Sequence, residues 1–464
     1  MNVVLLVVDS LRAASLDHRR NGAPRTPFLD RLGRETLRFT QARATECWTL
    51  PTHLSMFTGL LPSEHGAHFR SMEYGNRAPT VAELFEASGY HTEVLTRNSL
   101  FDGTIPGATR GFSRLTRVLA EVKGLPDPLS LLLAVSKPRV RRLIRTSGFF
   151  HTLQRDDGRF LTTLARMIVP ADAPLLERTL DVMAEKRRQR RPYFLFVNCY
   201  DVHAPYAPRP DSPLASFGTL GGWIENLMLP RLSVRLGNHA YLQPGFRMSR
   251  RGHDILLRRY HRAIELMDGK LETFYESARA AGLLDETLLV IVSDHGEAFG
   301  DHDLYFHDAS NWDTHLRVPL WIRHPALAPA VVDDCVSTRE LFGLLARVAS
   351  GGTLDGTILD ADTRGRAPVA LAEHFHYSHL PKLQPRWARD VAAAVVGKRK
   401  LLFGPDGPVL YDLAEDPGES APQPATIDDF AALCRDDGVS PAAVQVAYTH
   451  LARWGAKLGA GGDA

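Results

Sequence analysis

Two acidic turns in the sequence directly follow apolar runs that are typical of buried strands. Asp9-Ser10 ends the run Val3–Val8, and Asp294-His295 follows the run Leu288–Val292. A carboxylate and an imidazole at strand ends can bind one divalent cation through oxygen and nitrogen. Each turn alone also has a simpler interpretation, because Asp9 could cap a following helix and an isolated Asp-His pair is more often structural. The two turns therefore form a candidate metal site.

A hydroxyl group and two imidazoles extend this set of reactive residues. Thr49 opens the segment Thr49-Leu50-Pro51-Thr52-His53, which predicts the start of a helix. Helix N-termini stabilise anions, so a threonine there could form an alkoxide at lower cost. An ordinary Thr-x-Pro helix start without catalysis is the alternative. His203 follows another predicted strand, in Asp201-Val202-His203, and could equally be a structural loop histidine.

The elements that must position these residues alternate between strands and helices. Four near-continuous apolar runs are typical of parallel strands covered on both faces. They are Val3–Val8, His91–Thr96, Tyr193–Asn198 and Leu288–Val292. Amphipathic stretches precede three of them, at Thr80–Ala87, Leu175–Arg188 and Ile255–Ala281. The alternation predicts an α/β fold with a mostly parallel central sheet sandwiched by helices. Ligands bind at the carboxyl ends of such strands. The residues expected at this edge are Asp9, Asp201, His203, Asp294 and His295.

The composition indicates a folded protein with more than one core. Of 464 residues, 44% are hydrophobic and 23% are charged, and the formal net charge is +2. These values exclude disordered, collagen-like and coiled-coil chains, and they give no overall attraction to nucleic acid. Because a single core stops growing at roughly 250–300 residues, we expect a large α/β domain over residues 1–380 and a small subdomain over residues 381–464.

The small C-terminal subdomain is predicted to contain antiparallel strands followed by a helix. The candidate strands are Val391–Val396, Lys400–Phe403 and Val409–Tyr411, and the helix is Pro441–Leu458. Two irregular stretches of the large domain, Arg114–Ala173 and Arg209–Arg251, do not fit the alternation. We expect them to be insertions that either cap the sheet edge or form a lid that selects the substrate.

The cysteines and the apolar runs bear on the compartment. The chain has four cysteines, Cys47, Cys199, Cys335 and Cys434, which are far apart and form no CxxC pair. This spacing argues against a disulfide framework and against a structural zinc site. No apolar run approaches the ~20 residues of a membrane span. The N-terminal run has no basic region before it and is interpreted as a buried strand rather than a signal segment. We therefore expect a cytoplasmic protein without a transmembrane segment.

Six ordered motifs together resemble the sulfatase family of the alkaline phosphatase superfamily. The first three are Asp9-Ser10-Leu11-Arg12, Thr49–His53 with Thr58-Gly59, and Thr80–Leu84 with Gly89–Thr92. The later three are Asp201–Tyr206, Ser293–Glu297 with Gly300-Asp301-His302 and Arg317–Leu320, and Lys398–Leu401 with Leu410–Glu419. The resemblance runs nearly from end to end, and it implies a sulfatase-like fold with a small antiparallel C-terminal subdomain.

The chain departs from the family's pattern at residues that carry its chemistry. Family sulfatases place at the Thr49 position a cysteine or serine that is oxidised to a formylglycine hydrate, and threonine is not a substrate for that maturation. Cys47 lies two residues too early to replace it. His53 stands in place of the family arginine, Ser10 in place of a second aspartate, and Asp294-His295 in place of an Asp-Asn pair. An unmodified threonine with an Asp-His pair instead resembles the phosphotransferase and phosphodiesterase branches of the superfamily.

The resemblance implies one divalent metal ion and a set of residues around it. The metal-site residues are Asp9, Ser10, Thr49, Asp294 and His295. Imidazole nitrogen favours Mn²⁺ or Zn²⁺ over Ca²⁺ or Mg²⁺. The cation would make the Thr49 alkoxide accessible near neutral pH. The predicted catalytic set is Thr49, His53, His203, His302 and His307. His203 and His307 would contact non-bridging oxygens, whereas His302 is either a leaving-group acid or a structural residue.

The leading prediction is a sulfatase-like hydrolase that cleaves or transfers a phosphate ester through a Thr49-linked intermediate. Sulfuric-ester hydrolysis is the alternative within the family. A catalytically silent binding protein is a third hypothesis, which the altered Ser10, Ala14 and His53 keep open. The spacing of Asp201 and His203 predicts no complete second metal site. We expect a small-molecule or glycan-type ester as substrate and no nucleic acid as partner, and the substrate's identity and the oligomeric state remain open.

Overall fold

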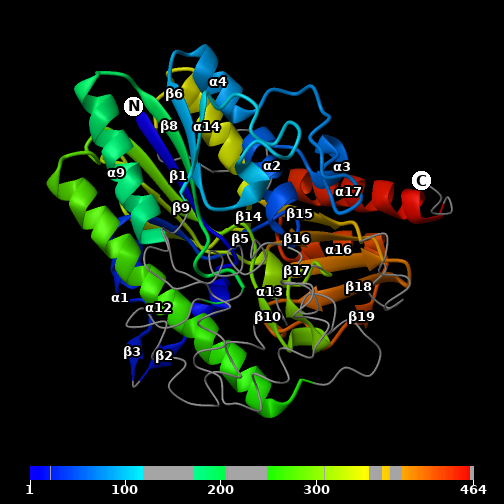
Figure 1. The fold of residues 1–464 in the computed structure, drawn as a ribbon. Coiled ribbons are helices and arrows are strands. Elements are labelled where there is room, and N and C mark those ends of the chain that lie inside the picture. Colours follow the sequence, from blue (N-terminus) through cyan, green and yellow to red (C-terminus); the bar gives the residue numbers. More distant parts are fainter. Residues whose placement is uncertain are drawn as a thin grey trace, which may run out of the picture.

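A large sheet with helices on both faces and a smaller sheet beside it make up the fold (Figure 1). The computed structural model describes residues 1–20, 22–118, 172–204, 206, 248–307, 309–354, 368–376 and 389–459. Within these residues, no helix is both long and apolar enough to cross a membrane.

The central sheet has eight strands in the order β13-β4-β12-β9-β1-β8-β6-β7. Their bounds are β1 (Asn2–Val8), β4 (Leu37–Phe39), β6 (His91–Thr96), β7 (Arg114–Arg117), β8 (Tyr193–Cys199), β9 (Thr287–Val292), β12 (Leu320–Arg323) and β13 (Ala330–Val332). The core strands β9, β1, β8, β6 and β7 are parallel, whereas β12 runs antiparallel to both β9 and β4. The predicted mostly parallel α/β sheet is confirmed, and all four predicted strands belong to it.

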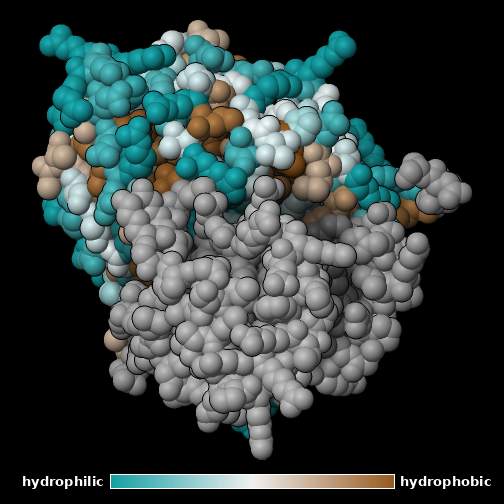
Figure 2. Space-filling model, in the orientation of Figure 1, coloured by the Kyte–Doolittle hydropathy of each residue, from teal (hydrophilic) through white to brown (hydrophobic). Residues whose placement is uncertain are grey.

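Strand β1 is buried on both faces, which explains why its sequence is apolar without alternation. Val4, Leu6 and Val8 belong to one hydrophobic core, whereas Val3, Leu5 and Val7 belong to another. The first core includes residues of α9 (Asp172–Arg188) and α12 (Arg250–Ala280). The second includes residues of α2 (Thr49–Thr58), α4 (Val81–Ala87) and α14 (Leu341–Ala349). Figure 2 shows hydrophilic residues over much of the upper rim of the molecule. The buried apolar side chains of these helices belong to the two cores.

Short elements complete the large α/β part. The helical ones are η1 (Ala13–Ser15), α1 (Pro27–Glu35), α3 (Pro62–His65), η2 (Ser99–Phe101), η4 (Asp301–Asp303), α13 (Asp313–Leu316) and η5 (Thr338–Glu340). The extended ones are β2 (Arg19–Arg20), β3 (Ala23–Pro24), β5 (Ala42–Arg43), β10 (Ala298–Phe299), β11 (Tyr305–Phe306) and β14 (Val336–Ser337). Arg12, not Asp9, lies at the N-cap of η1, so Asp9 is not a helix cap.

The second sheet is antiparallel and has five strands, in chain order from β15 to β19. They are β15 (Val369–His374), β16 (Val391–Val396), β17 (Arg399–Gly404), β18 (Gly407–Asp412) and β19 (Gln423–Pro424). Helices α16 (Ile427–Asp436) and α17 (Pro441–Gly459) share a hydrophobic core with this sheet. The predicted antiparallel strands and C-terminal helix are thus present. The division into two domains stays a prediction, but the small sheet already begins at β15, before residue 381.

The two predicted insertions are shorter than expected at their edges. Residues 114–117 form β7, which pairs in parallel with β6, and Asp172 already belongs to α9. Residues 250 and 251 open α12. The sequence missed β7 because its Arg-Leu-Thr-Arg sequence is polar, as suits an exposed edge strand. The remaining parts of both stretches, residues 119–171 and 209–247, lie outside the described residues.

Asp268 of α12 provides a testable link between two layers of the fold. Its two carboxylate oxygens accept hydrogen bonds from the backbone N–H groups of Phe28 (3.0 Å) and Leu29 (2.9 Å) at the start of α1. The N-cap residue Thr26 makes no such side-chain bond. Asp268 is buried, so its removal leaves two helix N–H groups without an acceptor.

We therefore expect Asp268→Ala to lower the free energy of unfolding by about 2 kcal/mol. Asp268→Asn, which keeps one acceptor oxygen, should lose less. The measurement is urea denaturation followed by circular dichroism. Asp254→Ala, at an exposed position of the same helix, should change stability by less than about 0.5 kcal/mol. Equal losses in Asp268→Ala and Asp254→Ala would contradict this account of the α1 cap.

Candidate active site

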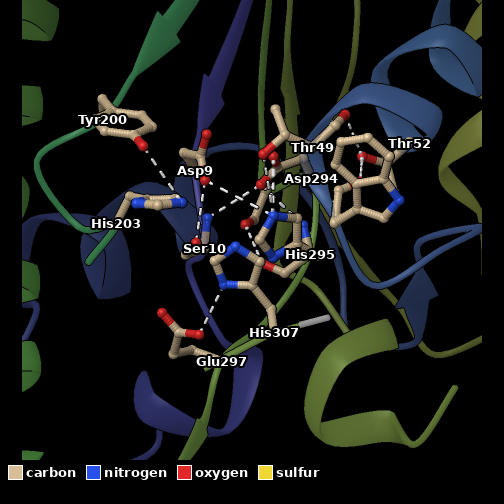
Figure 3. A network of polar contacts seen from close by, with 12 residues as sticks. Asp9, Ser10, Thr49, Thr52, Tyr200, His203, Asp294, His295, Glu297 and His307 are labelled. Atoms are coloured by element: carbon tan, nitrogen blue, oxygen red, sulfur yellow. Dashed lines mark hydrogen bonds and ion pairs between the residues drawn. The ribbon is translucent and has the colours of Figure 1, made fainter. Parts of the chain in front are cut away.

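The register of β1 and β9 brings Asp9 and Asp294 together at the carboxyl edge of the sheet. Val7 pairs with Val292 across the two parallel strands, so two residues further along each strand the carboxylates meet. Ser10, which follows Asp9, has a left-handed backbone with φ 61°. This turn lets its N–H donate to Asp294 Oδ1 (3.1 Å) and its hydroxyl to Asp9 Oδ1 (3.1 Å) (Figure 3). Ser10 is therefore a bridge between the two carboxylates.

Asp9, Asp294 and His295 form a fully buried group of candidate metal ligands. One ligand atom of each lies within 4.8 Å of the others. The Nδ1–H of His295 donates to Gly296 O (3.0 Å), which leaves Nε2 directed at Asp9 Oδ1 (3.8 Å) and Asp294 Oδ2 (3.4 Å). The Oδ2 atoms of both aspartates are buried and have no hydrogen-bond partner. These two orphaned oxygens and one imidazole nitrogen are the donor set that a divalent transition metal prefers.

The pKa shifts at this group have one physical cause. Burial, reinforced by the charge of Asp294, raises the pKa of Asp9 to about 6. Burial also raises the pKa of Asp294 to about 7 and lowers that of His295 to about 3. Each shift means that burial disfavours the charged form of the side chain. A cation at the orphaned oxygens would restore both carboxylates to their charged form, so the residues fit the metal ion that the sequence predicts.

Thr49 lies at the first position of α2 and is almost fully buried. Its hydroxyl is 3.4 Å from His295 Nε2, so the predicted nucleophile reaches the metal-ligand group. Thr52 does not share this role, because its hydroxyl donates to the carbonyls of Trp48 and Thr49 (both 2.9 Å).

His53 lies behind Thr49 rather than beside it. Its Nδ1 donates to Thr49 O (2.7 Å) and is 3.7 Å from Asp294 Oδ2. The ring is fully buried against Phe101 and Phe196, and burial lowers its pKa to about 3. A neutral imidazole therefore stands where the family carries an arginine. The placement favours a positioning role for His53 over direct contact with substrate.

His203 and His307 lie close to the metal-ligand group, and Glu297 holds one of them. His307 has its ring centre 4.3 Å from that of His295 and 4.9 Å from that of His203. The Nδ1 of His307 is bonded to Glu297 Oε1 (2.8 Å), which leaves Nε2 directed at the site (Figure 3). His203 stacks on Tyr200, with ring centres 4.3 Å apart. Both predicted oxygen-contacting histidines are thus brought to one place.

His302 is not brought to this group. Its ring stacks on Trp312, with centres 3.9 Å apart and planes within 6°. Its charged neighbours are Asp301, Lys400 and Asp416, so it faces the small sheet. Among the described residues, no hydrogen bond or ring contact joins it to the metal-ligand group. This placement favours the structural role that the sequence left open, because an acid must reach the leaving group.

Asp201 is also separate from the candidate metal site, although it follows β8 as predicted. It pairs with Arg97 (2.7 Å) and with Lys270 of α12. Its backbone N–H and that of Tyr200 donate to the buried carboxylate of Asp172. Two cations and two helices therefore fix the loop that carries His203. The absence of a complete second metal site at Asp201 and His203 stays a prediction.

Two supporting residues were missed at the level of sequence. Glu297 is fully buried, accepts from Tyr206 Oη (2.9 Å) and orients His307. Tyr260 of α12 donates to Ser10 O (2.7 Å) and accepts from Arg12 N (2.8 Å), which fixes the left-handed turn. A carboxylate three residues after Asp294 is a signal that could have found Glu297. Tyr260 lies 250 residues from Ser10 in the chain, so no local pattern points to it.

Comparison with known proteins gives one coherent group of relatives. A protein-family model described as Sulfatase matches residues 1–351. The choline-sulfatase of Rhizobium meliloti is 24% identical, over 90% of this chain and 81% of its own. The steryl-sulfatase of Mus musculus is 26% identical, over 97% of this chain and 84% of its own. The crystal structure of the phosphonate monoester hydrolase of Agrobacterium radiobacter superposes with a TM-score of 0.63 and 18% identity, covering 96% of both chains.

Because Asp9 and Asp294 are a like-charged pair, Asp294→Asn should affect the stability of the protein in opposite directions with and without metal. Asp294→Asn removes a ligand and should abolish binding of one equivalent of Mn²⁺ or Zn²⁺. In the presence of a chelator, the variant should melt no lower than the parent protein, because a buried charge is gone. With Mn²⁺ at a hundred times its dissociation constant, only the parent protein should gain about 2.7 kcal/mol.

The measurements are metal analysis after gel filtration and thermal melting with and without metal. Asp285→Asn, at an exposed position before β9, is the control and should bind metal normally. Full metal stoichiometry in Asp294→Asn would rule out this ligand set.

Proposed function

The chain belongs to the sulfatase family, and from its site we propose that it cleaves or transfers a singly charged phosphate or sulfate ester group through an intermediate on Thr49. The observation that carries the proposal is the Thr49 hydroxyl, 3.4 Å from His295 Nε2, beside the orphaned oxygens of Asp9 and Asp294. The family and its relatives make the chain a hydrolase of ester bonds.

Thr49 acts as the nucleophile in this proposal. Its hydroxyl oxygen forms a bond to phosphorus or sulfur while the bond to the leaving alcohol breaks. The neighbouring Asp294 carboxylate, which lies against the same His295 Nε2 as the Thr49 hydroxyl, is the proposed acceptor of the hydroxyl proton. The N-terminus of α2 favours the developing negative charge. Asp9, Asp294 and His295 would hold a divalent ion, with the Ser10 and Thr49 hydroxyls beside it. When bound, that ion supplies positive charge that lowers the pKa of the nucleophile and offsets charge on the transferred group.

The second half of the reaction follows from the choice of threonine. Its side-chain carbon carries a single oxygen, so the covalent group is released only when a second oxygen attacks phosphorus or sulfur. Water as that attacker gives hydrolysis, and an alcohol gives transfer. His203 and His307 contact the non-bridging oxygens in both halves, as their positions beside the ligand group support. Glu297 holds His307 at Nδ1, so this ring keeps its orientation through the cycle.

Charge selects the substrate class in this proposal. His295, His53 and His307 are neutral, because burial lowers the pKa of His295 and His53 to about 3 and that of His307 well below its usual range. Within the described residues, the cations around the site are already paired. Arg97 and Lys270 pair with Asp201, and Arg12 pairs with Asp301 (2.9 Å).

The two ligand carboxylates, Asp9 and Asp294, and one divalent ion together carry no net charge. A singly charged group, such as a sulfate ester, a phosphate diester or a phosphonate monoester, then adds one negative charge. A phosphate monoester adds two, and each uncompensated buried charge costs several kcal/mol. The site therefore favours singly charged esters.

The surroundings of the reaction are also part of the proposal. The relatives named choline-sulfatase and steryl-sulfatase support a small-molecule or glycan-type ester as substrate. All four cysteines lie in the described part of the chain, and none forms a disulfide. Reduced cysteines are usual in the cytoplasm, which supports the location predicted from the sequence.

Substitutions in α2 test the nucleophile. Thr49→Ala removes the oxygen that forms the covalent bond, so turnover of an aryl ester should fall to near background while binding survives. Thr49→Ser keeps the hydroxyl but loses the methyl group that restricts its rotamer, so it should retain part of the activity. Mass spectrometry of trapped enzyme should place the adduct on the Thr49 peptide.

Thr52→Ala is the matched control, since that hydroxyl bonds only backbone carbonyls. It should keep most of the turnover. Thr49→Ala turning over at the parent rate would mean that water attacks directly. A folded, metal-loaded protein that cleaves no ester of the panel would support the silent binding protein instead.

A panel of aryl esters tests the charge argument. At pH 8, kcat/KM for 4-nitrophenyl phosphate, a dianion, should be at least ~100-fold below that of the best singly charged ester. The singly charged esters are 4-nitrophenyl sulfate, bis(4-nitrophenyl) phosphate and 4-nitrophenyl phenylphosphonate. His307→Lys places a cation at this position, where the family carries a lysine. It should reduce the difference in kcat/KM between the dianion and the best singly charged ester by roughly tenfold. A parent enzyme that prefers the dianion would refute the charge argument.

A further inference from the structure

A second cluster of metal-ligating side chains lies outside the active site, in the segment that precedes Thr49. Glu46 and Cys47 come from this segment, and His374 ends β15 of the small sheet. All three side chains are fully buried. Glu46 and Cys47 lie 328 and 327 residues before His374 in the sequence. Only the packing of the two sheets brings the three side chains together.

The distance between the sulfur and the nitrogen of the cluster fits a shared metal ion, and the arrangement of its groups does not fit a catalytic relay. Cys47 Sγ lies 3.6 Å from His374 Nδ1, and Glu46 Oε1 lies 2.9 Å from the same nitrogen. A thiol–imidazole–carboxylate relay would need the thiol and the carboxylate on opposite ring nitrogens. Tetrahedral zinc with bonds of roughly 2.3 Å to sulfur and 2.0 Å to nitrogen places those two atoms ~3.5 Å apart. The observed separation of sulfur and nitrogen matches that value.

The polar atoms of the cluster give an independent indication. Glu46 Oε1 accepts from Cys47 N (2.9 Å) and contacts His374, but its other oxygen, Oε2, is buried without a partner. A buried carboxylate normally has both oxygens satisfied, because an unmade bond costs the desolvation of that atom. His374 Nε2 is also buried without a partner.

We propose that Glu46, Cys47 and His374 bind one zinc-class transition-metal ion. Thiolate and imidazole ligands select zinc over calcium, magnesium or manganese. On binding, Cys47 releases its thiol proton to solvent, and His374 binds through Nδ1 in the tautomer with its hydrogen on Nε2. The three ligands leave a fourth position for water. The sequence argued against structural zinc because the cysteines form no CxxC pair, but ligands from distant segments leave no such pattern.

The position of this zinc site gives it a structural purpose. A backbone bond from Glu373 N to Thr45 O (2.9 Å) already joins β15 to this segment. The ring centres of Phe69 and Trp48 are 4.2 Å apart in a stacked pair, and those of Phe69 and His374 are 5.8 Å apart in an edge-to-face pair. These rings form an apolar side of the cluster. The ion would fasten the small sheet to the chain two residues before Thr49.

Cobalt substitution tests the proposal, since Co²⁺ bound by a thiolate gives a near-ultraviolet charge-transfer band. The active-site group contains no sulfur, so Co²⁺ there gives none. The metal-free full chain, saturated with Co²⁺, should show a band whose intensity corresponds to one thiolate-bound Co²⁺ per chain, and Zn²⁺ should bind with a total of two. Cys47→Ser should lose the band and bind one Zn²⁺. Cys434→Ser, at another buried thiol, should keep the band and both ions.

Two further variants separate this site from the active site. Asp294→Asn should lose turnover and one ion but keep the band, so failure of the proposed function and failure of this site are distinguishable. Glu46→Gln keeps the Cys47 thiol and the size of the side chain. It should raise the dissociation constant of Co²⁺, measured by the charge-transfer band, by at least tenfold. No band in folded, Co²⁺-loaded protein, or a band that persists in Cys47→Ser, would overturn the proposal.

Discussion

Two buried carboxylates that must lie side by side constrain the whole molecule. The parallel register of β1 and β9 leaves Asp9 no position except beside Asp294, and each carries an oxygen without a partner. Like charges in a buried place disfavour each other's ionised forms. A divalent cation between them would offset both charges at once, which is why this pair is the candidate metal site. Thr49 and His307 lie against His295 of this group, and His203 lies against His307.

The rest of the fold enforces two strained backbone conformations next to this group. Ser10 and Phe306 have left-handed backbones, with φ of 61° and 64°, and each is adjacent to a site residue, Asp9 or His307. Such conformations cost of order 1–3 kcal/mol each and persist only where the surroundings enforce them. Tyr260 fixes the Ser10 turn, and His315 Nε2 donates to Phe306 O (2.7 Å). A buried network continues outward from α13 to the small sheet, joining Asp313 to Arg43, Lys400 and Glu419. The small sheet thereby supports the catalytic edge.

The extent to which sequence predicted this molecule follows from the range of each interaction. The apolar runs fixed β1, β6, β8 and β9 because burial on both faces leaves a continuous pattern. The residues after them gave Asp9, Asp294, His295 and His203 because a strand's end is a local feature. Glu297, Tyr260 and the cluster at Glu46 depend on contacts between distant segments, and these leave no spacing to find. His302 has the right residue type within a matching motif, but its stacking on Trp312 turns it toward the small sheet.

The segment from Thr45 to Thr49 is where these constraints meet. The small sheet holds its first residue through the backbone of Glu373, and the cluster at His374 holds the next two. Thr49 then enters the helix with its hydroxyl at His295 and its carbonyl on His53. A nucleophile must be held to within a fraction of an ångström to react efficiently. An arginine at position 53 would add positive charge here, whereas a neutral histidine in an aromatic pocket holds Thr49 in place without adding charge. In the proposed mechanism, placement of the nucleophile is thus separate from charge stabilisation, which would fall to the metal ion and to His203 and His307.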